Sequence, residues 1–231
     1  MLELFIANKN YSSWSMRPWV LMREVGIDFL EVMVPFDDLG PGSAFRQALS
    51  GLTPAGKVPV LRDGPLVVWD SLAIAETLAE RFPDQALWPA DAALRARARS
   101  LCAEMHAGFR GLREAYPMNI EASLPEAGAI AWRDRPALRA DVARIDAMWS
   151  ECLAARGGPM LFGQFSIVDA YYAPVCMRFR TYAPPLSPAA QAYVERVAAL
   201  ASVREWIDGA LQEHRFVNED EPYRLAPAQR P

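Results

Sequence analysis

The chain has 231 residues, 52% hydrophobic composition and a formal net charge of −4 from 24 basic and 28 acidic residues. A chain this long and this apolar buries a sizeable core, which excludes intrinsic disorder as its main state. The acidic balance leaves no general basic surface for a nucleic-acid backbone, and no apolar run approaches the ~20 residues of a membrane span. The first ten residues also lack the pattern of a signal peptide. We therefore expect neither a nucleic acid nor a membrane as partner.

The spacing of cysteine and histidine predicts free thiols and no metal. Cys102, Cys152 and Cys176 are widely spaced and odd in number, which is typical of buried thiols in the reducing cytoplasm rather than of a disulfide framework. His106 and His214 lie far apart, and the chain has no CxxC or HxxxH pair. A zinc site needs such clustered ligands, so we expect none.

Residues 1–83 alternate between strand-like and helix-like segments. In chain order, the pattern predicts a strand over 2–7, a helix over 17–25, a strand over 29–34, an irregular helix or loop, two strands over 58–61 and 66–69, and a helix over 71–82. The Asp63-Gly64 pair between the last two strands is a hairpin turn signal. This order predicts an α/β unit.

From Asp91 on, apolar residues recur only at helical spacing. The first two predicted helices are 94–112 and 138–152, the second with Asp134 as its cap, Pro136 in its first turn and Gly157-Gly158 as its stop. A third follows a Ser166–Asp169 capping box, and Pro174 should end or kink it. Two more helices are predicted over 189–200 and 203–213. The tail after Glu219 holds three prolines and is expected to be loose. The sequence thus predicts an α/β domain over 1–83 and an all-α helical bundle domain over 90–231.

Three serines stand between the first strand and the first helix. Pro18 fits without loss only in a first turn, which places the helix start near Ser15, a natural N-cap, or Met16. A helix N-terminus attracts anions, and a hydroxyl from Ser12 or Ser13 placed there can donate to a thiolate, phosphate or carboxylate. The simpler interpretation, that all three serines are capping and turn residues, remains open.

Two further segments have both a structural and a functional interpretation. Pro59 stands at a strand entry, and a cis bond there would turn the backbone of Val58 toward a ligand; otherwise this is an ordinary strand entry with Lys57 in solvent. Asp70 and Ser71 precede an apolar helical face, so one of them should cap it. The functional alternative is a second helix N-terminus that holds a carboxylate.

The segments 56–61 (GKVPVL), 70–74 (DSLAI) and 162–170 (FGQFSIVDA), in this register, resemble a cytosolic glutathione transferase. The resemblance covers roughly residues 2–214. It implies a thioredoxin-like N-terminal domain, an all-helical C-terminal domain, glutathione as cosubstrate and a homodimer. The segment 12–17 (SSWSMR) resembles the serine-type zeta and tau classes, although Trp14 stands where the zeta class has cysteine.

The resemblance also implies roles for single residues. Ser12 would donate its hydroxyl proton to the glutathione sulfur, with Ser13 as its main rival and Ser15 as a weaker one. The groups that would hold the rest of glutathione are Lys57 at the glycyl carboxylate, Val58 and the cis Pro59 at the cysteinyl part, and Asp70 and Ser71 at the γ-glutamyl end. The implied activity is conjugation of the thiolate to a small hydrophobic electrophile.

The electrophile is expected in an apolar cleft beside the sulfur. The residues expected to line this cleft are Tyr11, Trp14, Met105, Phe109, Tyr116 and Met118. Met105 and Phe109 also fit a core-facing stripe, and Arg110, Arg113 and Arg178 either meet an anionic substrate or are solvated or paired. Two alternative functions stay open: a glutathione-dependent isomerase or peroxidase, and a non-catalytic binding module.

Overall fold

A computed structural model describes residues 1–36, 40 and 42–226 of the chain. Its sheet has the strand order β2-β1-β3-β4, in which β1 pairs parallel with β2 and antiparallel with β3. The strands are β1 (Leu2–Ile6), β2 (Phe29–Met33), β3 (Val60–Asp63) and β4 (Leu66–Val68). The predicted hairpin is confirmed, since β3 and β4 pair antiparallel around Gly64, whose φ of 57° suits a residue without a side chain.

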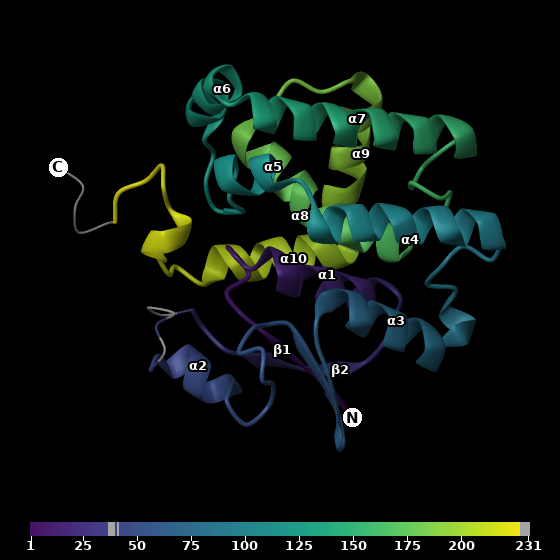
Figure 1. Ribbon diagram of the computed structural model, residues 1–231, viewed down its shortest axis with the longest axis vertical. Coiled ribbons are helices and arrows are strands. Elements are labelled where there is room, and N and C mark those ends of the chain that lie inside the picture. The colour runs from purple at the N-terminus through teal and green to yellow at the C-terminus, as the bar shows by residue number, and fades with distance from the viewer. Residues whose placement is uncertain (37–39, 41, 227–231) are drawn as a thin grey trace.

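Helices cover both faces of this sheet (Figure 1). They are α1 (Ser13–Glu24), α2 (Ala44–Leu49) and α3 (Ser71–Arg81), followed by the short η1 (Pro83–Gln85). Side chains alternate along β1, so Leu4 and Ile6 enter the large core with α1 and α3. Phe5 on the other face packs in a smaller cluster with Phe45 of α2. This arrangement confirms the predicted thioredoxin-like domain.

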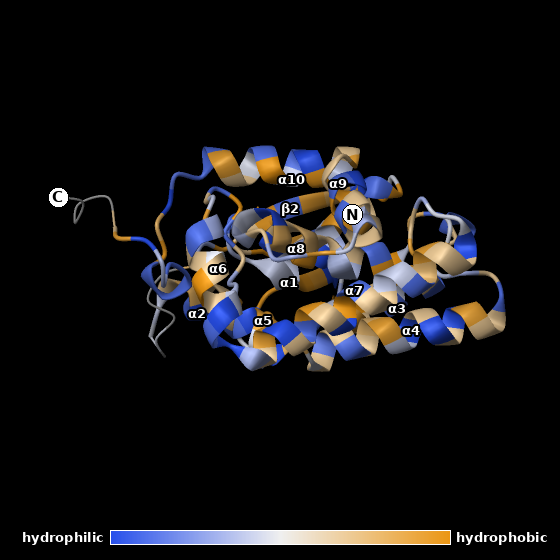
Figure 2. Cartoon of the chain, turned by 90° about the horizontal axis from the view of Figure 1, so that it is seen from above, coloured by the Kyte–Doolittle hydropathy of each residue, from blue (hydrophilic) through white to orange (hydrophobic). Residues whose placement is uncertain are grey.

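The remaining elements are helical and stack on the α1 side of the sheet (Figure 1). They are α4 (Ala92–Ala107), α5 (Arg110–Ala115), α6 (Pro125–Asp134), α7 (Pro136–Arg156), α8 (Ile167–Tyr182), α9 (Pro188–Ala198), α10 (Ala201–Gln212) and the short η2 (Asn218–Asp220). Helix α8 lies at the centre, and all its residues except Arg180 are buried. The outer helices α4 and α10 alternate apolar and polar residues (Figure 2). The all-helical second part is therefore confirmed.

The predicted start of the first helix near Ser15 or Met16 is wrong, and Pro174 does not end the helix that contains it. Helix α1 begins at Ser13 and contains Pro18, and α8 continues through Pro174 to Tyr182. Each proline removes one backbone hydrogen bond from its helix. The two helices pack against each other, and this burial offsets the loss.

Two other helix boundaries also differ from the prediction. Phe109 adopts a left-handed φ of 55°, which divides the expected 94–112 helix into α4 and α5. Asp134 ends α6, a helix absent from the prediction, and Arg135 takes the N-cap of α7 ahead of Pro136. Gly157, in the left-handed conformation, ends α7 as predicted.

The segment after Glu219 is packed rather than loose. The buried carboxylate of Glu221 accepts hydrogen bonds from Tyr11 Oη at 2.7 Å and from Asn119 Nδ2 at 2.8 Å. Arg224 donates to both oxygens of the same carboxylate. Charge-assisted bonds of this kind hold a segment that has no regular structure. Residues 227–231, the rest of the tail, lie outside the described part.

The expectation of buried, unpaired thiols is confirmed, because all three cysteines are buried and free. In the ranges 1–36 and 42–226, no helix combines the length and apolarity needed to cross a bilayer.

The predicted capping box at the start of α8 is present and buried. Ser166 donates its backbone N–H to Asp169 Oδ2 at 2.9 Å, and the Ser166 hydroxyl bonds the same oxygen. The other oxygen accepts from the Leu161 backbone at 3.2 Å and from Tyr193 Oη at 2.8 Å. One carboxylate therefore joins the loop before α8, the first turn of α8 and helix α9.

We predict that Asp169→Ala lowers the free energy of unfolding by about 3 kcal/mol, because it removes a cap and leaves buried donors without acceptors. Urea denaturation measures this change. Asp134→Ala is the matched control, since Asp134 is exposed and its side chain bonds Arg133 alone among the described residues. Its expected change is below about 0.5 kcal/mol. Equal losses in the two variants would contradict the assignment.

Candidate active site

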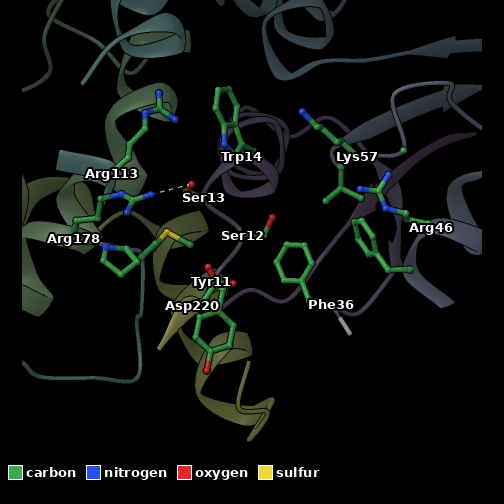
Figure 3. Close-up of a pocket in the computed structure, with 15 residues that line it drawn as sticks. Tyr11, Ser12, Ser13, Trp14, Phe36, Arg46, Lys57, Arg113, Arg178 and Asp220 are labelled. Carbon is green, nitrogen blue, oxygen red and sulfur yellow. Dashed lines mark hydrogen bonds between the residues drawn. The ribbon is translucent and has the colours of Figure 1, made fainter. Parts of the chain in front are cut away.

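Two adjoining cavities lie where the α1 N-terminus meets the helical part of the chain. The first has a volume of about 380 Å³ and is lined by Tyr11, Ser12, Ser13, Trp14, Phe36, Phe45, Arg46, Gly56, Lys57, Val58, Arg113, Pro117, Met118, Arg178 and Asp220 (Figure 3). The second, of about 480 Å³, is lined by Trp14, Ala55, Lys57, Val58, Pro59, Trp69, Asp70 and His106. Trp14, Lys57 and Val58 border both cavities.

Ser12 is the N-cap residue of α1, yet its side chain makes no capping hydrogen bond. Its hydroxyl instead donates to Ser15 Oγ at 2.7 Å, and Ser15 Oγ also accepts the Ala7 backbone N–H at 3.2 Å. By contrast, Ser43 caps α2 by accepting the Arg46 N–H at 3.2 Å. The interpretation of Ser12 as an ordinary capping serine therefore fails, and its hydroxyl faces the first cavity.

Ser13 also lines the first cavity, but its oxygen is engaged. Arg178 Nη2 donates to Ser13 Oγ at 3.1 Å, and Arg178 Nη1 donates to the Tyr116 carbonyl. A hydroxyl that accepts from a guanidinium keeps its own proton for a further acceptor. Both serine hydroxyls can thus donate a hydrogen bond to a ligand in the cavity. Ser12 would do so when Ser15 donates to it in turn, and Ser13 would do so while it accepts from Arg178.

Tyr11 contributes its ring, rather than its hydroxyl, to the first cavity. The hydroxyl bonds Glu221 Oε1 at 2.7 Å and the Arg215 carbonyl at 3.0 Å. Burial and the Glu221 carboxylate raise the pKa of Tyr11 well above its usual value. The phenol therefore stays neutral, and its hydroxyl stays hydrogen-bonded to the C-terminal segment.

Trp14 stands between the two cavities among cationic groups. The guanidinium carbon of Arg17 lies 4.1 Å from a Trp14 ring centre and that of Arg113 lies 4.8 Å from it. The His106 ring packs edge-on at 5.1 Å. Arg17 is almost wholly buried, and burial lowers its pKa to about 10.

The second cavity holds four of the five residues expected to bind glutathione. Lys57, Val58 and Pro59 form one wall, and the Val58–Pro59 bond is cis. Asp70 also lines this cavity, and it caps α3 by accepting the Leu72 N–H at 3.0 Å. Its second oxygen lies 3.2 Å from His106 Nε2.

The fifth residue, Ser71, turns its hydroxyl away from both cavities. Ser71 is fully buried, and its oxygen lies 3.4 Å from Arg17 Nη1 and 3.2 Å from Tyr171 Oη. As the first residue of α3, it still presents a backbone N–H of the first turn toward the helix N-terminus. The Ser71 hydroxyl is therefore used within the core.

Three of the expected electrophile-site residues lie in the core instead of the cleft. Met105 and Phe109 pack in the large apolar cluster between the helices, and neither belongs to the wall of either cavity. Tyr116 is fully buried, stacks on Tyr182 at 4.4 Å and donates to the Gly128 carbonyl at 2.8 Å. Helical periodicity identifies a buried stripe but does not separate core from cleft.

Met118, Tyr11 and Trp14 do line the first cavity, together with residues that the sequence did not single out. Phe36, Arg46 and Asp220 are in this group. Phe36 follows strand β2 and Arg46 lies in α2, and neither segment carries a functional motif. Asp220 belongs to the tail that the prolines predict to be loose. No local sequence signal identifies these three residues.

The cavity wall is rich in positive charge. Burial, and then the neighbouring charge of Arg113, lower the pKa of Arg178 to about 9, while burial raises the pKa of Asp220 to about 6. The described residues include no group of three or more histidine, cysteine or acidic side chains arranged to hold a metal ion. The site offers hydroxyls, backbone groups and cations, which suit an anionic ligand.

Comparison with known proteins gives matches along most of the chain. Residues 11–81 match the glutathione S-transferase N-terminal domain, and residues 130–209 match the glutathione S-transferase C-terminal domain. A stringent starvation protein A homolog of Histophilus somni is 26% identical over 77% of this chain and 77% of its own. The maleylacetoacetate isomerase of Pseudomonas aeruginosa is 31% identical over 52% of this chain and 55% of its own.

Among solved structures, a glutathione transferase homolog from Burkholderia gl BGR1, crystallised with bound glutathione, is similar to this chain. It is 25% identical, with a TM-score of 0.66, over 90% of this chain and 97% of its own. Its match spans both the sheet-containing part and the helical part. Together with the two matched domains, this similarity shows that the chain belongs to the glutathione S-transferase family.

Proposed function

We propose that this chain binds glutathione across the two cavities, stabilises its sulfur as a thiolate beside Ser12 and conjugates it to a small hydrophobic electrophile. The observation that carries the proposal is the Ser12 hydroxyl, which stands at a helix N-terminus, faces a cavity and does not cap the helix. A serine used only to end a loop would accept a first-turn N–H. Family membership and the glutathione-bound relative support the same ligand.

The mechanism uses a chain of hydroxyl groups. Serine is too weak a base to take the thiol proton, which leaves to solvent. When the sulfur is ionised, Ser15 can turn to donate to Ser12, and Ser12 then donates to the thiolate, with the Ala7 N–H holding Ser15 in place. Charge-assisted bonds of this type and the α1 dipole both favour the anion. The thiolate is the nucleophile that attacks the electrophile.

The rest of glutathione is assigned to the second cavity. Lys57 would face the glycyl carboxylate and the Val58 backbone would pair with the cysteinyl part. Asp70 would attract the γ-amino-acid ammonium while it also caps α3. The Ser71 backbone N–H would meet the γ-glutamyl carboxylate, since the Ser71 hydroxyl is used in the core. In this proposal, the domain over 1–83 binds glutathione and the domain over 90–231 supplies the electrophile site. The protein would act as a homodimer.

A second activity on the same scaffold has one specific observation in its favour. The similar Pseudomonas aeruginosa protein is named a maleylacetoacetate isomerase, so a glutathione-dependent isomerase is the alternative. Trp14 occupies the position of the cysteine in the zeta-class segment, which favours conjugation over that isomerisation. Turnover of maleylacetone without conjugation of 1-chloro-2,4-dinitrobenzene would favour the alternative, and failure to bind glutathione would favour a non-catalytic module.

We predict that Ser12→Ala raises the pKa of the bound glutathione thiol by about one unit, which corresponds to ~1.4 kcal/mol, with affinity changed only a few fold. The ultraviolet absorbance of the thiolate, followed against pH, measures this shift. Ser13→Ala is the matched control, because its oxygen accepts from Arg178 in the same cavity. If Ser13→Ala shifts the pKa of the bound thiol and Ser12→Ala does not, Ser13 rather than Ser12 contacts the sulfur.

We also predict that Lys57→Met weakens glutathione binding by about fivefold, or ~1 kcal/mol, because an exposed charge meets one carboxylate of the ligand. The pKa of the bound thiol should stay unchanged, since Lys57 acts at the glycyl carboxylate rather than at the sulfur. Calorimetric titration with glutathione gives the affinity. Arg62→Met serves as control, because Arg62 pairs with Glu3 on the sheet and borders neither cavity.

A further inference from the structure

Two arginines of the first cavity have no acidic partner within ion-pair distance among the described residues. Arg178 is 6% exposed, and its Nη groups donate only to Ser13 Oγ and the Tyr116 carbonyl. Its Nε–H is buried without an acceptor. Arg113 donates to the carbonyls of Met105, His106 and Gly108. The side chains are therefore held in place by neutral acceptors, and among the described residues no carboxylate pairs directly with either guanidinium.

Such an arrangement is costly unless an anion completes it. A buried charge is unfavourable without a countercharge, and here two cations also repel each other, which is why Arg113 further lowers the pKa of Arg178. Asp220 is the one acid among the described residues of the cavity wall, and burial disfavours its charged form. It makes no ion pair with either arginine within 4.0 Å in the described part of the chain.

The position of these cations separates them from the groups assigned to glutathione. Figure 3 shows Arg113 and Arg178 on one side of Ser12 and Ser13, and Lys57 on the other side. Lys57 also borders the second cavity, whereas Arg113 and Arg178 border only the first. If the sulfur lies at Ser12 and glutathione extends past Lys57, the two arginines face the second substrate.

We infer that the electrophile of this protein carries a carboxylate, which Arg113 and Arg178 bind while Trp14 and Met118 contact its apolar body. The inference rests on the proposed function for the direction in which glutathione lies. It replaces a purely apolar electrophile site with one that selects an organic acid. Paired guanidinium groups suit a planar carboxylate, because each presents donors in a fixed fork.

The chain provides a matched control for each arginine. Arg180 lies two positions after Arg178 on α8 and is exposed, and Arg110 lies on α5 with Arg113 and pairs with Glu114 at 2.6 Å. Neither control residue borders the two cavities. Arg178→Met and Arg113→Met therefore test the site, while Arg180→Met and Arg110→Met remove the same charge from the same helices.

The experiment compares 4-chloro-3-nitrobenzoate with 4-chloro-3-nitrobenzamide. In each reaction the glutathione sulfur bonds to the ring carbon, chloride leaves with its electron pair, and the thiol proton goes to solvent. Each kcat/KM is divided by the rate with free glutathione, which removes the intrinsic difference between the rings. We expect the carboxylate to be preferred by about tenfold, and the two site variants to abolish this preference through KM. The controls should retain it.

Binding of 3-nitrobenzoate to the protein saturated with S-methylglutathione gives a readout without turnover. Loss of 3-nitrobenzoate binding in Arg113→Met, with glutathione affinity unchanged, supports the inference. If the protein conjugates no electrophile, this result still supports the inference, and only the proposed conjugation fails. Equal use of acid and amide by the unmodified protein, or absence of nitrobenzoate binding, overturns the inference. Weakened glutathione binding in the arginine variants also overturns it. If Arg178→Met does not fold, Arg113→Met and the unmodified protein still decide.

Discussion

The burial of α1 between the sheet and the helical part is the constraint on which the site depends. Almost every residue from Ser13 to Met22 is buried, and the helix packs against α3, α8 and α10. This burial fixes the helix axis, and so it fixes where the N-terminus points. The core therefore holds a hydroxyl at that end in a fixed position, so in the proposed mechanism no positional freedom is lost when it bonds the ligand.

The polar residues of α1 follow from the same constraint. Ser15 and Arg17 are buried on the helix, and each also has a partner from another element: the Ala7 backbone for Ser15, and Ser71 and the Tyr171 ring for Arg17. The position that the family resemblance assigns to ligand binding, Ser71, therefore supports the first helix through its side chain. In the proposed binding mode, the contact with glutathione at this position comes from the Ser71 backbone N–H.

Much of the fold could be predicted from local rules, and the failures have a common cause. The Asp63-Gly64 hairpin, the Ser166 capping box and the Gly157 helix end are decided by a few adjacent residues, and each is present. Pro18 and Pro174 break local rules, but the packing of α1 on α8 compensates. At the site, sequence motifs identify Ser12 and Lys57, and both residues line the first cavity. Met105 is expected there because of its helical spacing, but the same spacing is typical of core residues, and Met105 lies in the core.

The segment that contains Glu221 has a consequence for how substrate range changes in evolution. It ties Tyr11, Asn119 and Arg224 to one carboxylate, and its neighbour Asp220 forms part of the cavity wall. Among the described residues of this stretch, only the short η2 (Asn218–Asp220) is regular, and none of its residues is fully buried. Substitutions and insertions around Asp220 can therefore reshape the entrance and charge of the cavity while the anchor at Glu221 and the folded domains stay intact. Specificity can diverge here at little cost to stability.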